Sequence, residues 1–312
     1  MSETQLERNI SKSVIPDAYP QLELPDSVEL SSVKIWSRGI PLDGDIYRPK
    51  QLQDSDKVAG VVLCHGLGGD KKSLERHAAL LASQGIIAVT FTQGTWGQSG
   101  GNVLYRGDQP ELDNNNRAQV EVQFIKNLVD PMDWIQNCRA AVDYLEGEPN
   151  IDPQRLGTWG TSFGGGIVIQ EAASDERIKA MVTQVAAAPV AAGDLKKLAK
   201  MRAIDIARGN MDPIPQGIDP VPPYDCTLHL ASTLQYNALD ASTRLHVPSL
   251  IMAAENEEFF ANADHSEKVF KNLEGRVPCH YEVIPDINHY GVYFDGYQQT
   301  SSKALKWFQK YL

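Results

Sequence analysis

The sequence lacks the features that mark metal-binding, disulfide-rich and membrane-spanning proteins. It has only 4 cysteines in 312 residues, and none of them form a C-x-x-C pair, so neither a zinc site nor a disulfide framework is indicated. No stretch reaches the roughly 18 apolar residues that a membrane helix needs. The first residues carry no basic flank followed by an apolar run. We therefore expect a cytoplasmic protein without a membrane partner.

Positive charge is also scarce. The chain has 29 Lys and Arg residues against 40 Asp and Glu residues, which gives a formal net charge of −11. Such acidity repels phosphate backbones and anionic lipids, so we expect no nucleic-acid partner. The remaining composition, 42% hydrophobic and 22% charged residues, is typical of an ordinary globular protein and leaves homo-oligomerisation open.

The length of 312 residues suits one large α/β domain with an insertion. Residues 1–28 are polar and interrupted by prolines, which favours an N-terminal extended arm on the surface. We expect the first part of an α/β core over residues 29–188, a cap or lid insertion over 189–246, and the second part of the core over 247–312.

Hydrophobic periodicity predicts the elements of this core. The first two predicted strands alternate apolar and polar side chains on either side of a turn, as an antiparallel pair does. Beyond residue 57 strands and helices alternate, which indicates a mostly parallel sheet with helices on both faces. Strands are predicted at 28–35, 44–47, 58–64, 86–92, 155–159, 178–188, 250–254 and 280–284. Helices are predicted at 74–83, 131–145, 165–174, 195–208 and 301–312, and a turn at 151–153.

The predicted insertion breaks the alternation of strands and helices. After the helix at 195–208 comes a proline-rich tract at 212–223 that has no regular pattern. A structureless tract of this length inside a compact chain is typical of a lid or a binding loop. We therefore expect residues 189–246 to cover the functional site, with a surface insertion that has no role as the alternative.

The most informative stretch is Gly160-Thr161-Ser162-Phe163-Gly164, a G-x-S-x-G pattern. A predicted strand precedes it and a predicted helix follows it, which is the setting of a nucleophile elbow. The elbow projects a serine hydroxyl from strained backbone, so the residues two before and two after the serine must lack side chains. Ser162 is therefore the candidate nucleophile. The alternative is a serine that only caps the helix.

A serine nucleophile needs a base within hydrogen-bond reach and a third group that orients this base. The base should lie on a loop after the last predicted strand, and of the 7 histidines only His289 has this position. The others are expected in helices (His77, His265), at a strand start (His280), in the cap (His229, His246) and in a glycine-rich loop (His65).

The third group should follow the strand at 250–254, where Glu255, Glu257 and Glu258 offer three carboxylates. We select Glu257. Glu255 and Glu258 stay as alternatives, because acidic residues are also favoured at the start of a helix. Asp286 is expected to form a turn.

A pair of backbone N–H groups should stabilise the oxyanion, an effect often worth ~3 kcal/mol per donor. The segment His65-Gly66-Leu67-Gly68-Gly69 follows a predicted strand and is similar to the H-G-x-G loop that contributes one donor. We predict the N–H groups of Leu67 and Phe163 as the two donors. The alternative, a phosphate-binding loop, would need the P-loop Lys and Ser/Thr that this segment lacks.

With nucleophile, acid and histidine in this order, the chain resembles the α/β-hydrolases, and more narrowly the dienelactone-hydrolase-like esterases and acyl-peptidase-like hydrolases. The resemblance covers roughly residues 30–312. It implies the α/β-hydrolase fold, the triad Ser162, Glu257 and His289, and the oxyanion donors Leu67 and Phe163. It also implies acyl transfer to water without a metal or an organic cofactor.

Two features depart from the family's pattern. The acid is commonly Asp in such enzymes and here is Glu, which is one methylene longer, so either its loop lies further back or another carboxylate serves. Thr92 and Gly94 stand where Asp and Arg usually pair.

We expect a serine esterase that hydrolyses small to medium, partly hydrophobic carboxylic esters through an acyl-enzyme intermediate. Its small-molecule substrate is expected to contact four aromatic side chains beside the motifs: Trp96, Phe259, Phe260 and Tyr290. The same residues would serve an acyltransferase, a peptidase, a thioesterase or a carbon–carbon hydrolase, and these alternatives stay open. So does a binding protein that kept the fold without catalysis.

Overall fold

One large sheet organises the chain in the computed structural model, which describes residues 15–16, 18–214 and 217–312. Its strands are β1 (Val28–Ser37), β2 (Ile40–Pro49), β3 (Val58–Cys64), β4 (Ile87–Phe91), β8 (Ile151–Thr161), β9 (Ile178–Gln184), β11 (Ser249–Ala254) and β12 (Cys279–Ile284). They lie in the order β1-β2-β4-β3-β8-β9-β11-β12. The pairs β1–β2 and β2–β4 are antiparallel, and every pair from β4 to β12 is parallel. The mostly parallel sheet predicted from the sequence is therefore confirmed.

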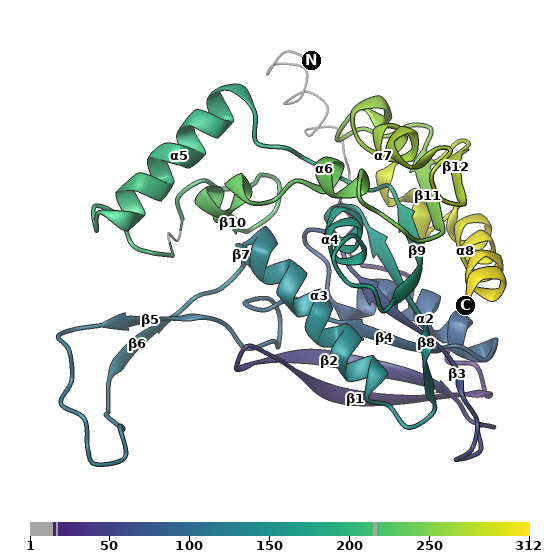
Figure 1. The fold of residues 1–312 in the computed structure, drawn as a ribbon, viewed down its shortest axis with the longest axis horizontal. Helices are drawn as coiled ribbons and strands as arrows, with labels where there is room; N and C mark the ends of the chain where they lie inside the picture. The colour runs from purple at the N-terminus through teal and green to yellow at the C-terminus, as the bar shows by residue number, and fades with distance from the viewer. Residues whose placement is uncertain (1–14, 17, 215–216) are drawn as a thin grey trace.

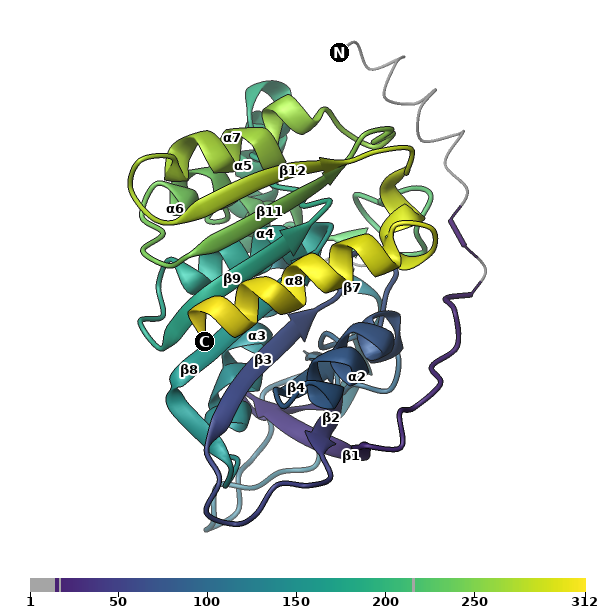
Figure 2. The ribbon, with the colours of Figure 1, turned by 90° about the vertical axis from the view of Figure 1, so that its right-hand side faces the viewer.

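Helices cover both faces of the sheet, which is why its central strands consist of apolar runs. One face carries α2 (Glu75–Ser83) and α8 (Tyr297–Tyr311), which lie in front of the sheet in Figure 2. The other face carries α3 (Pro131–Glu146), α4 (Phe163–Ala172), α6 (Ala238–Ser242) and α7 (Ser266–Leu273). Each face has its own hydrophobic core, which includes Trp159 on the first face and Trp134 on the second.

Among the described residues, four short 3₁₀ turns complete the connections between these elements: η1 (Lys71–Leu74), η2 (Leu230–Leu234), η3 (Asn262–Asp264) and η4 (His289–Tyr293). Two of them begin with a side-chain cap. The Asp70 carboxylate accepts hydrogen bonds from the first turn of η1, and the Asn288 side chain accepts one from Gly291 N in η4. Caps of this kind satisfy backbone N–H groups that have no partner within the turn.

Two insertions extend from the sheet. A hairpin of β5 (Val103–Arg106) and β6 (Glu121–Phe124) projects away from the body, at the left of Figure 1. The part of the predicted insertion 189–246 that precedes α6 contributes α5 (Gly193–Ala207) and β10 (Thr227–Leu228), and β10 pairs in parallel with β7 (Leu128–Val129). An ion pair of 2.8 Å between Arg106 and Asp212 joins the two insertions.

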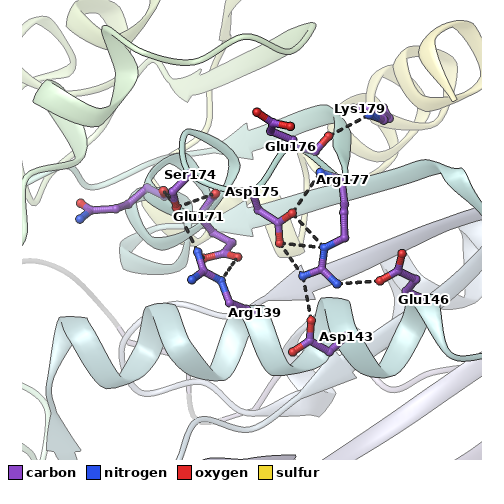
Figure 3. Close-up of polar contacts among 10 residues, drawn as sticks. Arg139, Asp143, Glu146, Glu171, Ser174, Asp175, Glu176, Arg177 and Lys179 are labelled. Carbon is purple, nitrogen blue, oxygen red and sulfur yellow. Dashed lines mark hydrogen bonds and ion pairs between the residues drawn. The ribbon is translucent and has the colours of Figure 1, made fainter.

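A charged cluster, drawn in Figure 3, fixes the C-terminal end of α4, whereas Ser162 lies at the N-terminal end of this helix. Arg139 of α3 donates two hydrogen bonds, of 2.9 and 3.1 Å, to the fully buried carboxylate of Glu171 in α4. Arg177 makes ion pairs with Asp143, Glu146 and Asp175 at 2.6–2.8 Å. The cluster thereby ties α3, α4 and the start of β9 together behind the candidate site. Burial raises the pKa of Glu171 to about 7, against the opposing effect of Arg139.

The extents of several elements differ from the predictions. The predicted turn at 151–153 is wrong: β8 begins at Ile151, which pairs with Val58, and pairing resumes only at Leu156, so a bulge separates the two. β9 ends at Gln184 instead of residue 188, and α8 begins at Tyr297 instead of residue 301. The two-residue strands β7 and β10 and the projecting hairpin were not predicted.

Some predicted features lie outside the described residues. These are positions 1–14 and 17 of the expected extended arm and positions 215–216 of the proline-rich tract. In the part of the chain that is described, no helix combines the length and the apolar character needed to cross a bilayer.

Candidate active site

Ser162 lies at the sharp turn between β8 and α4, with φ 54° and ψ −125°. This backbone conformation is strained for a residue with a side chain. The neighbouring glycines make the turn possible. A Cβ at Gly160 would lie 2.3 Å from the carbonyl oxygen of Gly164, and a Cβ at Gly164 would lie 2.4 Å from that of Cys64. The G-x-S-x-G spacing therefore follows from the close approach of β8, α4 and the end of β3.

His289 and Glu257 complete a chain of hydrogen bonds that starts at Ser162. The Nε2 atom of His289 lies 2.9 Å from Ser162 Oγ, and its Nδ1 atom lies 2.7 Å from Glu257 Oε2. The side chains of His289 and Glu257 are only 4% and 2% exposed. A carboxylate on Nδ1 holds the proton there, so Nε2 can accept the proton of the Ser162 hydroxyl.

The three carboxylates after β11 contact different parts of the histidine loop. Glu257 faces the imidazole of His289. Glu258 accepts a hydrogen bond of 2.9 Å from the backbone N–H of His289, and Glu255 accepts one of 2.9 Å from the backbone N–H of Asp286. The structure therefore brings Glu257, the selected acid, to the ring, and the two alternatives to the backbone.

The two predicted oxyanion donors lie on segments that flank Ser162. Leu67 is the second residue of a turn that Gly69 N closes onto Gly66 O at 3.2 Å, so its own N–H is not used by the turn. A Cβ at Gly66 would lie 2.7 Å from Ser162 Cβ, so this turn runs directly against the nucleophile. Phe163 is the first residue of α4, where a backbone N–H has no acceptor within the helix.

His65 fixes the position of this turn, a role that the sequence analysis did not assign. Its Nδ1 donates a hydrogen bond of 2.7 Å to Gly66 O, and its Nε2 accepts one of 3.1 Å from Gln93 N. Burial lowers the pKa of His65, which keeps the ring neutral and able to do both. The sequence feature that could have revealed this role is the histidine of the H-G-x-G pattern.

An apolar cavity of about 270 Å³ opens beside Ser162 and His289. Its walls come from the core (Leu67, Val129, Phe163) and from the insertion (Leu195, Val221, Leu228, Tyr236). Among the residues described, no Lys, Arg, Asp or Glu lines it. The cavity therefore suits a neutral, apolar group.

Two of the four predicted substrate contacts, Phe259 and Phe260, line this cavity. The other two do not. Trp96 is 8% exposed, its Nε1 donates a hydrogen bond of 2.8 Å to Leu128 O, and its ring packs edge-on against Trp134. Trp96 is a core residue and does not line this cavity, so its position gives no support to the predicted substrate contact. Tyr290 lies beside His289, with ring centroids 5.4 Å apart, but points to a neighbouring cavity.

Tyr224, Tyr236 and Leu228 line the cavity although nothing in the sequence singled them out. They belong to the irregular part of the insertion, whose position depends on the short β7–β10 pairing. Two-residue strands carry no periodic signal, so sequence patterns do not reveal them.

Comparisons with known proteins identify related families. The model of the dienelactone hydrolase family matches residues 42–201, and that of the prolyl oligopeptidase family matches residues 133–312. Quorum-quenching protein AidA of Acinetobacter baumannii is 30% identical over 155 residues, which are 49% of this chain. The match spans only 42% of AidA.

Solved structures show the same fold. The α/β hydrolase GrgF from Penicillium superposes with a TM-score of 0.69 at 15% identity, over 91% of this chain and 99% of GrgF. The ferulic acid complex of Est1E from Butyrivibrio proteoclasticus superposes with a TM-score of 0.63 at 19% identity, over 89% of this chain and 98% of Est1E. The prediction of an α/β-hydrolase fold is confirmed.

Proposed function

The chain belongs to the dienelactone hydrolase family, and from this premise we propose that it is a serine hydrolase that cleaves carboxylic esters. One observation carries the proposal: the two ring nitrogens of His289 hydrogen-bond to Ser162 and Glu257 at 2.9 and 2.7 Å. This arrangement supports a triad in which Ser162 is the nucleophile, His289 the base and Glu257 the orienting acid.

The proposed reaction proceeds in two halves. His289 takes the proton of Ser162 as the hydroxyl attacks the ester carbonyl, and the N–H groups of Leu67 and Phe163 stabilise the oxyanion. His289 then protonates the departing alcohol, which leaves an acyl group on Ser162. In the second half, His289 takes a proton from the water that attacks the acyl carbonyl and then returns it to Ser162 Oγ as the acyl–oxygen bond breaks, which releases the carboxylic acid.

The size and lining of the apolar cavity indicate which acyl groups the protein binds. A cavity of about 270 Å³ beside Ser162 fits a small to medium acyl chain, and the described residues that line it offer no Lys or Arg to an anionic acyl group. We therefore propose neutral, partly hydrophobic acyl groups, of acetyl to octanoyl size, as the substrate class.

Substitution of Ser162 tests the proposal. Ser162→Ala should lower kcat for p-nitrophenyl butyrate hydrolysis by several orders of magnitude, with an unchanged unfolding midpoint. A fluorophosphonate probe should label the native protein and leave Ser162→Ala unlabelled. Full activity or unchanged labelling of the variant would overturn the assignment. Product analysis with an added alcohol or amine acceptor separates hydrolysis from acyl transfer, because a transferase forms the new ester or amide in place of the free acid.

A further inference from the structure

The hairpin of β5 and β6 has one side that is entirely apolar, which we call the hairpin face. The register of the two strands pairs Val103 with Phe124 and Tyr105 with Val122. Paired residues lie on the same side of a sheet, so these four side chains form the hairpin face. Within the part of the chain that the structure describes, they remain open to solvent: Val103 is 46%, Tyr105 43% and Phe124 63% exposed.

The opposite side of the hairpin is the one that holds it to the body. Successive residues of a strand point to opposite sides, so Leu104 and Arg106 lie on this second side. Leu104 is 5% exposed and packs with Ile125 and Leu128. Arg106 forms an ion pair of 2.8 Å with Asp212. These contacts fix the hairpin in its projecting position (Figure 1) and leave the hairpin face unused.

An apolar face of this size needs a covering. A two-stranded hairpin alone is marginally stable in water, and it becomes stable when an apolar side packs on something else. Two further exposed side chains of the connecting loop, Leu112 at 57% and Val120 at 45%, add to the apolar surface of the hairpin. One hairpin thereby offers on the order of 400 Å² of apolar surface. Contact between two hairpins would bury roughly 1,000 Å² in total, which a specific interface requires.

The pattern of the hairpin face selects a second copy of this chain as its covering. Phe124 and Tyr105 occupy one diagonal of the four paired positions, and Val103 and Val122 occupy the other. A two-fold rotation about an axis along or across the strands therefore sets each aromatic ring opposite a valine of the second copy. Large side chains then meet small ones, as close packing requires. We propose that the protein forms a two-fold symmetric dimer in which the hairpin faces of two copies pack together.

The charges of the hairpin do not oppose this contact. The formal net charge of −11 makes two copies repel each other at long range. The four residues of the hairpin face are uncharged, and Arg106 and Glu121 pair with each other in the register on the opposite side. The hydroxyl of Tyr105 donates to the carbonyl of Asp108, so burial of its ring leaves no unpaired donor. Closing the contact therefore buries apolar surface without an isolated charge.

Sedimentation of the full chain tests the dimer. Between about 1 and 100 µM the mass should rise from that of one chain to that of two, as an interface of this size allows. Phe124→Ser should raise the dissociation constant of the dimer at least 100-fold, because a two-fold contact loses the ring from both copies. Phe124→Leu keeps an apolar side chain and should raise the constant by less than about 10-fold.

Trp36→Ser is the matched control. Trp36 is 65% exposed, about as much as Phe124, but lies on β1 outside the hairpin. Its substitution should leave the dissociation constant unchanged. Because Phe124 is exposed in the single chain, Phe124→Ser should keep the far-ultraviolet circular dichroism of the native protein. If it does not fold, Tyr105→Ser takes its place with the same expected loss of the dimer.

Three results would overturn the dimer. The first is a native protein that stays monomeric at about 100 µM. The second is a dimer that Phe124→Ser weakens no more than Trp36→Ser does, since the contact would then lie elsewhere on the surface. The third is a mass that grows beyond two chains with concentration, because a two-fold contact between identical faces closes at two copies.

Discussion

Glu258 accepts a hydrogen bond of 2.9 Å from the backbone N–H of His289, while the preceding residue, Glu257, faces the His289 ring. Adjacent carboxylates thus hold the main chain and the side chain of one histidine. The ring of Phe259, whose own N–H donates to Glu257 Oε1 at 3.1 Å, packs edge-on against the imidazole, with ring centroids 4.7 Å apart. The loop after β11 therefore fixes both the position and the rotation of His289.

The two carboxylates should respond differently to conversion into amides. Glu257→Gln replaces the acceptor for Nδ1–H by a group that can also donate to Nδ1, which favours the wrong tautomer, so kcat should fall by about 10³-fold. Glu258→Gln keeps an oxygen that can accept the His289 N–H, so kcat should change by less than about 5-fold. Steady-state hydrolysis of p-nitrophenyl butyrate measures both. A larger loss of kcat in Glu258→Gln than in Glu257→Gln would show that Glu257 is not the orienting acid.

The sequence was sufficient to predict which loops meet, because the carboxyl ends of parallel strands lie at one edge of a sheet. Ser162 follows β8, Glu257 follows β11 and His289 follows β12, and a strand was predicted from the sequence for each, at 155–159, 250–254 and 280–284. The choice among Glu255, Glu257 and Glu258 was harder. The three lie within four positions, and only the direction of each side chain distinguishes them.

The residues that line the cavity were predicted less well than Ser162, Glu257 and His289, again because the direction of a side chain cannot be read from the sequence. Trp96 lies near a motif in the sequence, but its indole turns inward to bond with Leu128 O. Tyr224 and Leu228 reach the cavity through the pairing of β7 with β10, a contact between segments about 100 residues apart. Neither the rotation of one aromatic side chain nor a two-residue long-range pairing leaves a periodic pattern.

The oxyanion turn should not tolerate a side chain at Gly66. A Cβ there would lie 2.7 Å from Ser162 Cβ and 3.2 Å from Ser162 Oγ, so Gly66→Ala must displace the turn, the nucleophile or both. We expect kcat to fall by about 100-fold, comparable to the loss of one oxyanion donor. The matched control is Gly147→Ala at the end of α3, where a Cβ meets ordinary contacts of 3.4 Å or more. Full activity in Gly66→Ala would contradict the close packing of the turn on Ser162.

The insertion should contribute to acyl selectivity through α5. Leu195 lines the apolar cavity, whereas Met201 of the same helix is 57% exposed and does not. Leu195→Ala should lower kcat/KM for p-nitrophenyl octanoate by about 3-fold relative to the acetate, in line with the loss of roughly one methylene contact. Met201→Ala should leave the ratio unchanged. Identical chain-length profiles for the native protein and Leu195→Ala would show that α5 does not contact the acyl chain.

His77 should make the fold sensitive to acid. It is buried in α2 between Trp159 and Tyr297, and neither ring nitrogen has a hydrogen-bond partner in the described part of the chain. Burial lowers its pKa to about 3, so the unfolded chain takes up a proton as the pH falls below about 6.5 while the folded protein does not. Stability is therefore lost between pH 6.5 and pH 3.

The variant His77→Phe removes this titration and keeps an aromatic ring in the same contacts. The stability difference between the variant and the native protein should grow by roughly 3 kcal/mol in favour of the variant from pH 7 to pH 4. Urea unfolding at several pH values measures this difference. A difference that stays constant over that range would show that His77 does not titrate on unfolding.

Glu171 should lower the stability of the folded protein as the pH rises, whereas His77 lowers it as the pH falls. The pH range in which Glu171 acts also lies higher. Its folded-state pKa of about 7 lies above the usual 4.5, so the folded protein retains a proton that the unfolded chain releases. This contribution to stability is complete below pH 4.5 and is lost as the pH rises to 7, a total of roughly 3 kcal/mol. Arg139 limits the loss by pairing with the ionised carboxylate (Figure 3).

Glu171→Gln cannot titrate, so the stability of the native protein relative to this variant should fall between pH 5 and pH 8. Arg139 is 36% exposed and can be solvated when its partner is neutral, so the variant should fold. Urea unfolding of both proteins at pH 5, 6, 7 and 8 gives the difference. Because His77 is present in both, its own titration cancels. A difference independent of pH would mean that Arg139 compensates the burial of Glu171 fully and keeps its pKa near the usual value.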